Sequence, residues 1–401
     1  MNTLSEEKVF RDPIHGYVRV QDKIIWDCIQ TREFQRLRRV KQLGSTSMVY
    51  HTSEHSRFAH SLGVYEIARR MINEVNDISK ALTEYEKITV KLAALLHDVG
   101  HAPFSHSFES IMQSDHEIYT IQIIKGESEV NTLLKAYRDS LPDDVASVID
   151  GTHPNKILCQ MVSSQLDADR MDYLLRDSYF SGTKYGEFDL ERILRTMRVA
   201  DDKLVIKASG MHTIEDYIMA RYHMYWQVYY HPVSRSYDTL LQKVFQRLFD
   251  LYNEENNIVE KLPMFKALLE KNILSNEEMY LLDDSTCFYA FNLMSQIDDA
   301  ILSDLAKRIL NRNLFKYSTV DKKEEMKRRC LEKGYDLKYY LHQDYQSQNP
   351  YKPYSRRAQC IWVLEDDGSI KELSTVSTIV SSLSQNDSYE DEKIFFPKEI
   401  L

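Results

Sequence analysis

Residues 93–109 read AALLHDVGHAPFSHSFE, an apolar run that ends in closely spaced histidines and acidic residues. Its first half has the apolar pattern of a buried helix, which leads directly into the dipeptide His97-Asp98. His101, His106 and Glu109 follow in quick succession. Because buried polar groups need partners, the stretch indicates either a satisfied polar network near the core or a site built around a metal.

The composition bounds what the rest of the chain can be. The 401 residues are 43% hydrophobic, enough for a large core, and the few glycines and prolines (11 and 9) argue against disorder, collagen-type repeats and an all-β sandwich. A net charge of −10 argues against generic nucleic-acid binding, which needs a basic face. Five scattered cysteines, no apolar leader and no long apolar run lead us to expect a cytoplasmic protein without a membrane partner.

Helical periodicity recurs on both sides of the opening stretch, interrupted by short extended segments. We expect a helical core at residues 1–315 and a small α+β region at 316–401 that contains a serine-rich, acidic segment. The predicted helices cover residues 23–44, 61–79, 82–99, 156–176, 211–231 and 234–253. The predicted hairpins cover residues 9–21, 199–210 and 357–374.

Histidines are concentrated around the opening stretch. His97 and His101 are four residues apart and share a helix face, and His60 lies on a separate predicted helix. Imidazoles from two helices combined with carboxylates give the nitrogen and oxygen ligands of Mn, Fe, Zn or Ni sites. Seven of the thirteen histidines lie in this region: His51, His55, His60, His97, His101, His106 and His116.

A further oxygen ligand is expected from the segment SSQLDADRMDYLLRDS. We favour Asp169 for this role. A solvated acidic face, with an Asp–Arg pair three residues apart, accounts well for Asp167 and Asp172.

These residues carry a resemblance to a known family. His60, His97-Asp98 and Asp169 resemble the H…HD…D signature of the HD superfamily of metal-dependent phosphohydrolases. Five blocks, which lie within roughly residues 8–235, also follow the order seen in the deoxynucleoside triphosphate (dNTP) triphosphohydrolases, on the branch with the mammalian SAM-and-HD-domain enzyme. The blocks are DPIHGYVRV, FQRLRRVKQLG, SRFAHSLGV, HDVGHAPFSHSFE and DADRMDYLLRD.

The resemblance implies an HD-domain helical core with a divalent metal, which can be Mn, Fe, Zn, Ni or Mg. Its implied ligands are His60, His97, Asp98 and Asp169. Four further residues match positions beside the reacting phosphate and its water: His101, His106, Glu109 and His116. His106 matches a candidate general acid near the leaving 5′ oxygen, and Glu109 stands where the family usually has Asp.

The resemblance also implies a set of substrate contacts. Arg170 replaces the usual Lys as a cation for the triphosphate, and Tyr225 replaces a usual His. Gln42, Leu43 and Arg57 match groups around the sugar and phosphates, Tyr173 and Asp177 match groups at the ribose and its 3′-hydroxyl, Arg221 matches a phosphate contact, and Tyr229 matches a sugar or base contact.

The expected reaction is hydrolysis of a dNTP to the deoxynucleoside and inorganic triphosphate. Regulated family members bind an activating nucleotide at subunit interfaces and form tetramers, so the resemblance implies an allosteric homotetramer. Lys8, Val9, Gln35 and Arg38 match that second site, although plain surface charge also explains Lys8 and Arg38. Gln30 stands where the mammalian enzyme has an Asp that reads guanine.

Two other functions remain open. The first is another HD phosphohydrolase, acting on nucleoside monophosphates, cyclic dinucleotides or guanosine polyphosphates. It is disfavoured because no GYP motif follows the HD block and because GHAPFSH replaces the acidic pair of the guanosine polyphosphate hydrolases. The second is a nucleotide-sensing protein that binds without turnover, which the complete set of implied metal ligands disfavours.

Overall fold

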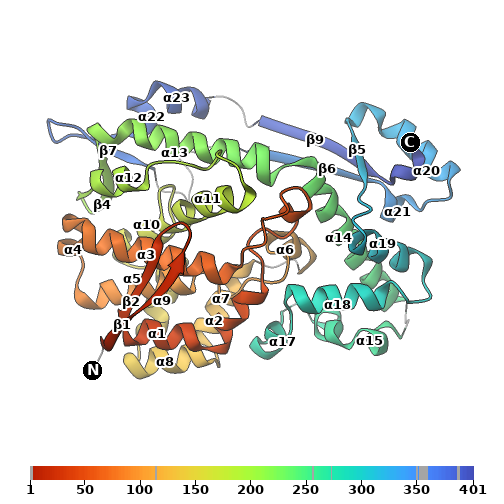
Figure 1. The fold of residues 1–401 in the computed structure, drawn as a ribbon, viewed down its shortest axis with the longest axis horizontal. Coiled ribbons are helices and arrows are strands. Elements are labelled where there is room, and N and C mark those ends of the chain that lie inside the picture. The colour runs from red at the N-terminus through yellow and green to blue at the C-terminus, as the bar shows by residue number, and fades with distance from the viewer. Residues whose placement is uncertain are drawn as a thin grey trace.

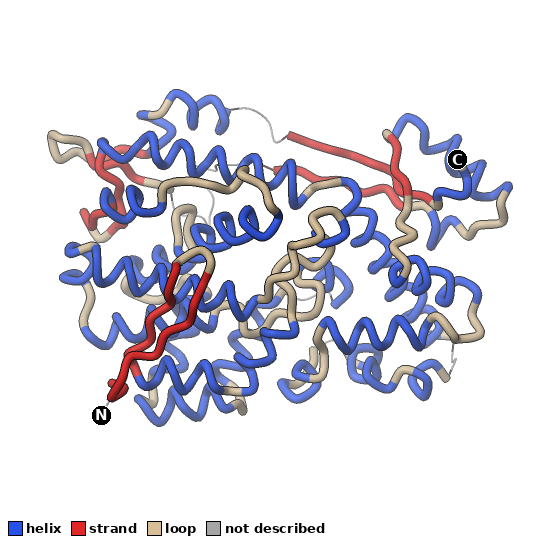
Figure 2. The backbone as a smooth tube through the Cα atoms, in the orientation of Figure 1, coloured by secondary structure: helices blue, strands red, loops and turns tan. Residues whose placement is uncertain are grey.

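The computed structural model describes residues 3–112, 115–254, 257–271, 273–348, 351, 360–385 and 389–401. It confirms the expected fold class, because the chain is mainly helical with short strands at its edges (Figures 1 and 2). The strands of the described part form an N-terminal hairpin and two small sheets. Within the same residues, no helix is both long and apolar enough to cross a membrane.

The chain begins with the predicted hairpin, formed by β1 (Thr3–Asp12) and β2 (Gly16–Asp22). The single helix predicted over residues 23–44 is wrong. Thr31 has an extended backbone (φ −61°, ψ 150°), which ends one helix, and its hydroxyl accepts a hydrogen bond from the backbone N–H of Phe34, which starts the next. The segment therefore forms α1 (Lys23–Gln30), α2 (Arg32–Arg36) and the 3-10 turn η1 (Leu37–Arg39).

Three helices at the centre of the first apolar core carry the site. They are α3 (Arg57–Glu74), α5 (Glu84–Leu96) and α11 (Ala168–Ser181), and both α5 and α11 pack against α3. The helix predicted over residues 156–176 is divided, because the Asp167 side chain caps a new helix start by accepting from the Arg170 N–H. The other helices of this part are α4 (Asn76–Ala81), α6 (His106–Met112), α7 (His116–Lys125), α8 (Glu129–Tyr137), α9 (Leu141–Ile149), α10 (Lys156–Val162) and α12 (Leu190–Thr196).

A second apolar core forms around the long helix α14 (Pro232–Asn253). α13 (Met211–Met224) leads to it through a π-helix, η4 (Tyr225–Tyr229). Further helices complete this side of the molecule (Figure 1): α15 (Ile258–Lys261), α16 (Lys266–Glu270), α17 (Asn276–Tyr280), α18 (Asp284–Met294) and α19 (Ala300–Leu310).

The stretch at residues 93–109 joins the two cores. Leu95 and Leu96 are fully buried in the first core, as expected of ordinary core residues. Phe104 and Phe108, a few residues later, belong to the second core. The loop that follows His97-Asp98 is therefore anchored at both ends by apolar packing.

The C-terminal part is built into both halves of the molecule. In one sheet, of order β3-β4-β7-β8, β4 pairs in parallel with β7, so residues far apart in sequence share one sheet. The hairpins predicted at 199–210 and 357–374 form as β3 (Met197–Ala200) with β4 (Lys203–Lys207) and as β7 (Trp362–Leu364) with β8 (Ile370–Glu372).

The other C-terminal sheet has the order β5-β9-β6, and its two long strands run above α14 in Figure 1. Of the predicted serine-rich, acidic segment, residues 386–388 lie outside the described residues. The strands of this sheet and the remaining helices are β5 (Lys316–Ser318), β6 (His342–Gln348), β9 (Tyr389–Phe396), α20 (Lys323–Glu332), α21 (Leu337–Tyr340), α22 (Leu373–Val376) and α23 (Thr378–Gln385).

Candidate active site

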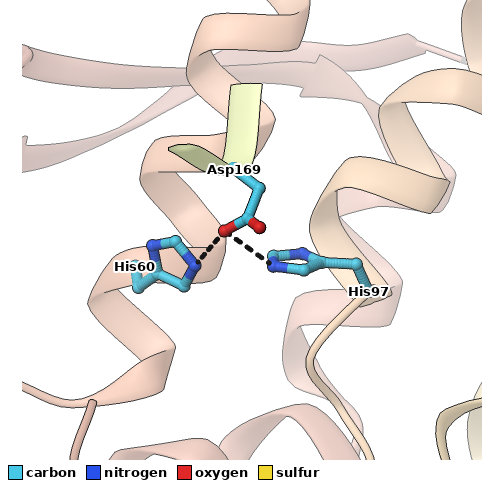
Figure 3. Close-up of side chains that lie close together, drawn as sticks. All are labelled: His60, His97 and Asp169. Carbon is cyan, nitrogen blue, oxygen red and sulfur yellow. Dashed lines mark ion pairs between the residues drawn. The ribbon is translucent and has the colours of Figure 1, made fainter. Parts of the chain in front are cut away.

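The four residues predicted as metal ligands converge from three helices. Figure 3 shows His60 of α3 and His97 at the end of α5 facing one oxygen of Asp169, in the first turn of α11. Asp169 Oδ1 lies 3.1 Å from His60 Nε2 and 3.7 Å from His97 Nε2. Asp98 adds a second carboxylate, with Oδ2 3.6 Å from His60 Nε2 and Oδ1 3.4 Å from His97 Nε2.

Both imidazoles present Nε2 to this cluster because Nδ1 is engaged elsewhere. His97 Nδ1 lies 2.9 Å from the carbonyl oxygen of Ala94, and His60 Nδ1 lies 2.8 Å from Asp172 Oδ2. His97 Nε2 is buried and has no hydrogen-bond partner among the described residues. Two imidazole lone pairs beside two carboxylates form a donor set that fits a divalent metal ion.

The electrostatics of the cluster also favour a cation. Burial opposes a charged His60, yet Asp169 and Asp172 raise its pKa to about 10. Burial likewise opposes a charged Asp169, yet the imidazoles of His60 and His97 hold the pKa of that carboxyl well below its usual range. The carboxylates thus create a negative potential in the space between the helices.

The interpretation of Asp167 and Asp172 as a solvated acidic face is wrong. Both are 0% exposed, because α11 is covered by α3 on one side and by α13 on another. The predicted pairing three residues apart is present, since Asp167 binds Arg170. Asp172 instead lies behind the metal cluster, where it bonds His60.

Three of the predicted catalytic residues form a second group beside Asp98. His101 Nε2 is 3.3 Å from Asp98 Oδ1, and its ring stacks on that of His116 with centroids 3.8 Å apart. His116 Nδ1 lies 2.5 Å from Glu109 Oε1. The fourth prediction, His106, is the first residue of α6, but its side chain lies outside the described residues.

The pKa values of the two stacked imidazoles are shifted in opposite directions. Burial, Arg57 and His116 hold the pKa of His101 well below its usual range, so His101 is neutral near pH 7. Burial also opposes a charged His116, but its hydrogen bond to Glu109 and the nearby Asp98 raise its pKa. The pair therefore combines a proton acceptor with an imidazole that holds its proton more firmly.

Two adjoining cavities surround these groups. The smaller one, of about 140 Å³, is lined by the metal-type cluster together with His101 and His116. The larger one, of about 600 Å³, shares with it the lining residues Gln42, Arg57, Asp169 and Tyr173. The larger cavity also contains four other residues predicted to contact substrate, namely Leu43, Arg170, Asp177 and Tyr229.

Arg221 is the predicted substrate contact that lines neither cavity. Its guanidinium lies 5.9 Å from the ring centroid of Tyr225, which itself lines the larger cavity. Because η4 is a π-helix, residues four and five apart lie on one face, and Tyr225, Tyr229 and Tyr230 all reach the cavity. The Tyr229 hydroxyl donates to Asp177 Oδ2 at 2.8 Å.

One wall of the larger cavity comes from the C-terminal region and was not predicted from the sequence. His342, Asp344 and Gln346 of β6 line it. Arg235 of α14 fixes this wall by donating from Nε to Asp344 at 2.7 Å and by pairing with Asp391 of β9. Polar side chains at every second position of HQDYQSQ are the signal that predicts one shared strand face.

The residues predicted to bind an activating nucleotide lie outside these cavities. Lys8 and Val9 belong to β1, and Val9 is 49% exposed. The Arg38 guanidinium stacks on Phe58 at 3.6 Å from the ring centroid and donates to Gln35 Oε1 at 2.8 Å. Their role as an allosteric site stays a prediction.

Comparison with known proteins gives the family. A model described as "HD domain" matches residues 57–177, and one described as "HD associated region" matches residues 188–263. The uncharacterized protein YwfO of Bacillus subtilis is 48% identical over 408 residues, which cover 99% of this chain and 94% of YwfO. The crystal structure of a phosphohydrolase from Bacteroides thetaiotaomicron is 30% identical, with a TM-score of 0.85 and coverage of 98% of this chain and 100% of that one.

A relative with a named activity matches part of the chain. The "Deoxynucleoside triphosphate triphosphohydrolase SAMHD1 homolog" of Dictyostelium discoideum is 33% identical over 253 residues, which cover 59% of this chain and 49% of that protein. The chain therefore belongs to the HD-domain phosphohydrolase family that includes the dNTP triphosphohydrolases, which confirms the resemblance.

Proposed function

We propose that this protein hydrolyses dNTPs to the deoxynucleoside and inorganic triphosphate in a metal-dependent reaction. The main support for the proposal is that the two cavities adjoin each other and share lining residues. One is lined by imidazoles and carboxylates that fit a metal, and the other is lined by cations, tyrosines and Asp177. The named activity of the Dictyostelium relative supports this choice of substrate.

His60, His97, Asp98 and Asp169 would hold the metal. When bound, a divalent ion supplies Lewis-acid polarisation of a phosphoryl oxygen and lowers the pKa of a bound water. Mn, Fe, Zn and Ni suit this mixture of imidazole and carboxylate ligands, whereas Mg, the fifth candidate, prefers oxygen ligands.

The protein's own cations would bind the triphosphate, which carries about four negative charges. Arg57 is held in place by Asp98 and by donation from Nε to Ser105 Oγ at 3.0 Å. Arg170 is held by Asp167. Both guanidinium groups line the larger cavity, so they are oriented before substrate arrives.

The remaining groups would move protons and read the sugar. Neutral His101 can accept a proton from water, while His116, bonded to Glu109, keeps its own proton. His106 is our candidate for the acid at the leaving 5′ oxygen. Asp177 accepts from Tyr229 and faces the larger cavity, where it would meet the 3′-hydroxyl beside Tyr173.

We further propose that the protein is an allosteric homotetramer activated by a nucleotide at its subunit interfaces. Lys8, Val9, Gln35 and Arg38 would form this second site. Gln30 replaces the guanine-reading Asp of the mammalian enzyme, so the activator need not contain guanine.

The proposal is tested by turnover of each of the four dNTPs with and without Mn²⁺, in the presence and absence of GTP or a second dNTP. Products are separated by anion-exchange chromatography, which distinguishes triphosphate from phosphate and pyrophosphate. We expect His97→Ala and Asp98→Ala to abolish triphosphate release, because each removes a ligand that the metal chemistry requires.

The matched control is His212→Ala, since that side chain is 85% exposed on α13. It should hydrolyse dNTPs like the unsubstituted protein. Undiminished triphosphate release from His97→Ala would disprove the proposed site. Metal binding without turnover of any dNTP, under every activator condition, would favour the nucleotide-sensing alternative.

A further inference from the structure

The turn between β1 and β2 contains the sequence DPIHG, to which the proposed reaction assigns no role. Asp12 Oδ1 accepts hydrogen bonds from the backbone N–H groups of Ile14 and His15 at 2.9 and 3.0 Å. Gly16 closes the turn with φ 70°, a conformation that favours glycine. The backbone on both sides of His15 is therefore fixed.

His15 reaches from this turn into the HD core. Its side chain is 1% exposed, and Nε2 lies 2.7 Å from Asp172 Oδ1. The other oxygen of the same carboxylate lies 2.8 Å from His60 Nδ1. His15 and the candidate metal ligand His60 thus bond opposite oxygens of one buried carboxylate.

Arg176 closes the network. It donates to Asp172 Oδ2 from Nε at 2.8 Å and to Oδ1 from Nη2 at 2.9 Å. Its third nitrogen, Nη1, donates to Asp12 Oδ2 at 2.8 Å. The turn is consequently tied to α11 twice, once through His15 and once through Asp12.

The position of Asp172 determines how His60 presents itself. An ionised carboxylate only accepts hydrogen bonds, so His60 donates to Asp172 from Nδ1, and Nε2 is the nitrogen that faces Asp169 and Asp98 and would offer its lone pair to a bound metal. Gly63, one turn after His60 on α3, makes room for this contact, because a Cβ there would overlap Asp172 and Arg176. The Asp172 carboxylate is therefore held between His15, His60, Arg176 and the backbone of Gly63.

We propose that His15 is a positioning residue of the metal centre, holding the Asp172 carboxylate against His60 Nδ1 from the N-terminal hairpin. This inference rests on the proposed metal-dependent function. Partners behind a metal-binding histidine set its tautomer and ring orientation, and their loss commonly weakens metal affinity by about 10- to 100-fold. A merely structural His15 would change the stability of the metal-free protein and leave its metal affinity unaltered.

The experiment titrates the metal-free, full-length protein with Mn²⁺ and follows the free ion by electron paramagnetic resonance. We expect His15→Ala to bind Mn²⁺ about 10- to 100-fold more weakly than the unsubstituted protein. His15→Gln should recover most of the affinity, because its amide N–H can reach the place of Nε2. His212→Ala is the control for loss of an exposed histidine and should bind Mn²⁺ normally.

Circular dichroism melting of each metal-free protein separates affinity from folding. If His15→Ala binds Mn²⁺ as tightly as the unsubstituted protein, or if His15→Gln binds no better than His15→Ala, the positioning role is overturned. Failure of the unsubstituted protein to bind Mn²⁺, Fe²⁺ or Zn²⁺ would overturn the metal site together with this role.

If His15→Ala loses its helical circular dichroism, it has not folded. The Mn²⁺ affinities of His15→Gln and His15→Asn are then compared instead. Asn is one methylene shorter, so its amide falls short of Asp172. The proposal requires tighter Mn²⁺ binding by the Gln variant, and equal affinities would overturn it.

Discussion

His60 and His97 face the same Asp169 oxygen, but the molecule supports them by different means. His97 is held by neutral groups close to it in the fold: Nδ1 bonds the carbonyl of Ala94, and the Thr120 hydroxyl donates to the His97 carbonyl at 3.0 Å. His60 is held by the charged Asp172, which other segments fix in turn. Charged hydrogen bonds are roughly twice as strong as neutral ones, and a buried charge left without its partner is costly. The two sides of one site should therefore respond differently to substitution.

The largest effect is expected on the His60 side. Asp172→Asn keeps the shape of the side chain but removes the charge that faces the fully buried Arg176. We expect the free energy of unfolding to fall by about 3–5 kcal/mol, the usual cost of breaking a buried ion pair from one side. Urea unfolding of the metal-free protein measures it, and a loss below about 1 kcal/mol would show that the charge contributes little.

A smaller effect is expected on the His97 side. The Thr120 hydroxyl donates to the His97 carbonyl and accepts from the Gly100 N–H, both at 3.0 Å. Thr120→Val keeps the volume and removes both bonds, which should lower the free energy of unfolding by about 1–2 kcal/mol. The same urea experiment compares it directly with Asp172→Asn. A greater loss for Thr120→Val would reverse the comparison between the two sides.

The last effect depends on pH and concerns a carboxyl whose hydrogen bonds come from neutral hydroxyls. Asp238 lines the larger cavity and accepts from the hydroxyls of Ser107 and Ser45 at 2.7 and 3.1 Å. Burial raises its pKa from 3.8 to about 6, and the two hydroxyls only partly offset this. The folded protein therefore holds the proton more firmly than the unfolded chain does.

The stabilising effect of that proton is complete below about pH 4 and is lost as the pH rises through about 6. Asp238→Asn has no carboxyl proton to lose, so it should raise the free energy of unfolding by up to about 3 kcal/mol at neutral pH and leave it unchanged in acid. Thermal melting from about pH 4 to about pH 8 measures the difference. A parallel pH dependence in both proteins would contradict the assignment.

The comparison also explains what the sequence could predict. The support of His97 is local, and the HD dipeptide at the end of an apolar run predicted its place directly. The convergence of His60 and Asp169 was expected from their position on separate helices and from the family resemblance. Asp172 was misread, because its spacing from Asp169 fits a solvated face as well as a buried one. Only the packing of α3 on α11 decides between them.

The rest of the site depends on contacts between distant segments. The contribution of β6 to the larger cavity requires the pairing of β6 with β9 and the ion pairs of Arg235, which no local pattern reveals. Likewise, the breaks at Thr31 and before Asp167 arise from single capping side chains inside runs whose apolar period continues. Periodicity predicts which face of a segment is buried. It does not predict where a polar side chain ends one helix and starts the next.

The path of residues 93–109 between the two apolar cores has a consequence for folding. Leu96 belongs to one core and Phe108 to the other, so the intervening loop takes its shape only after both have assembled. Phe104 and Ser105, at the crossing, have φ of 54° and 52°, a left-handed backbone that L side chains rarely adopt and that the surrounding packing must impose. A molecule with one core formed and the other still unfolded would keep much of its helix content and lack the larger cavity, whose lining comes from helices of both cores. Turnover is therefore a sensitive report of complete folding in this chain.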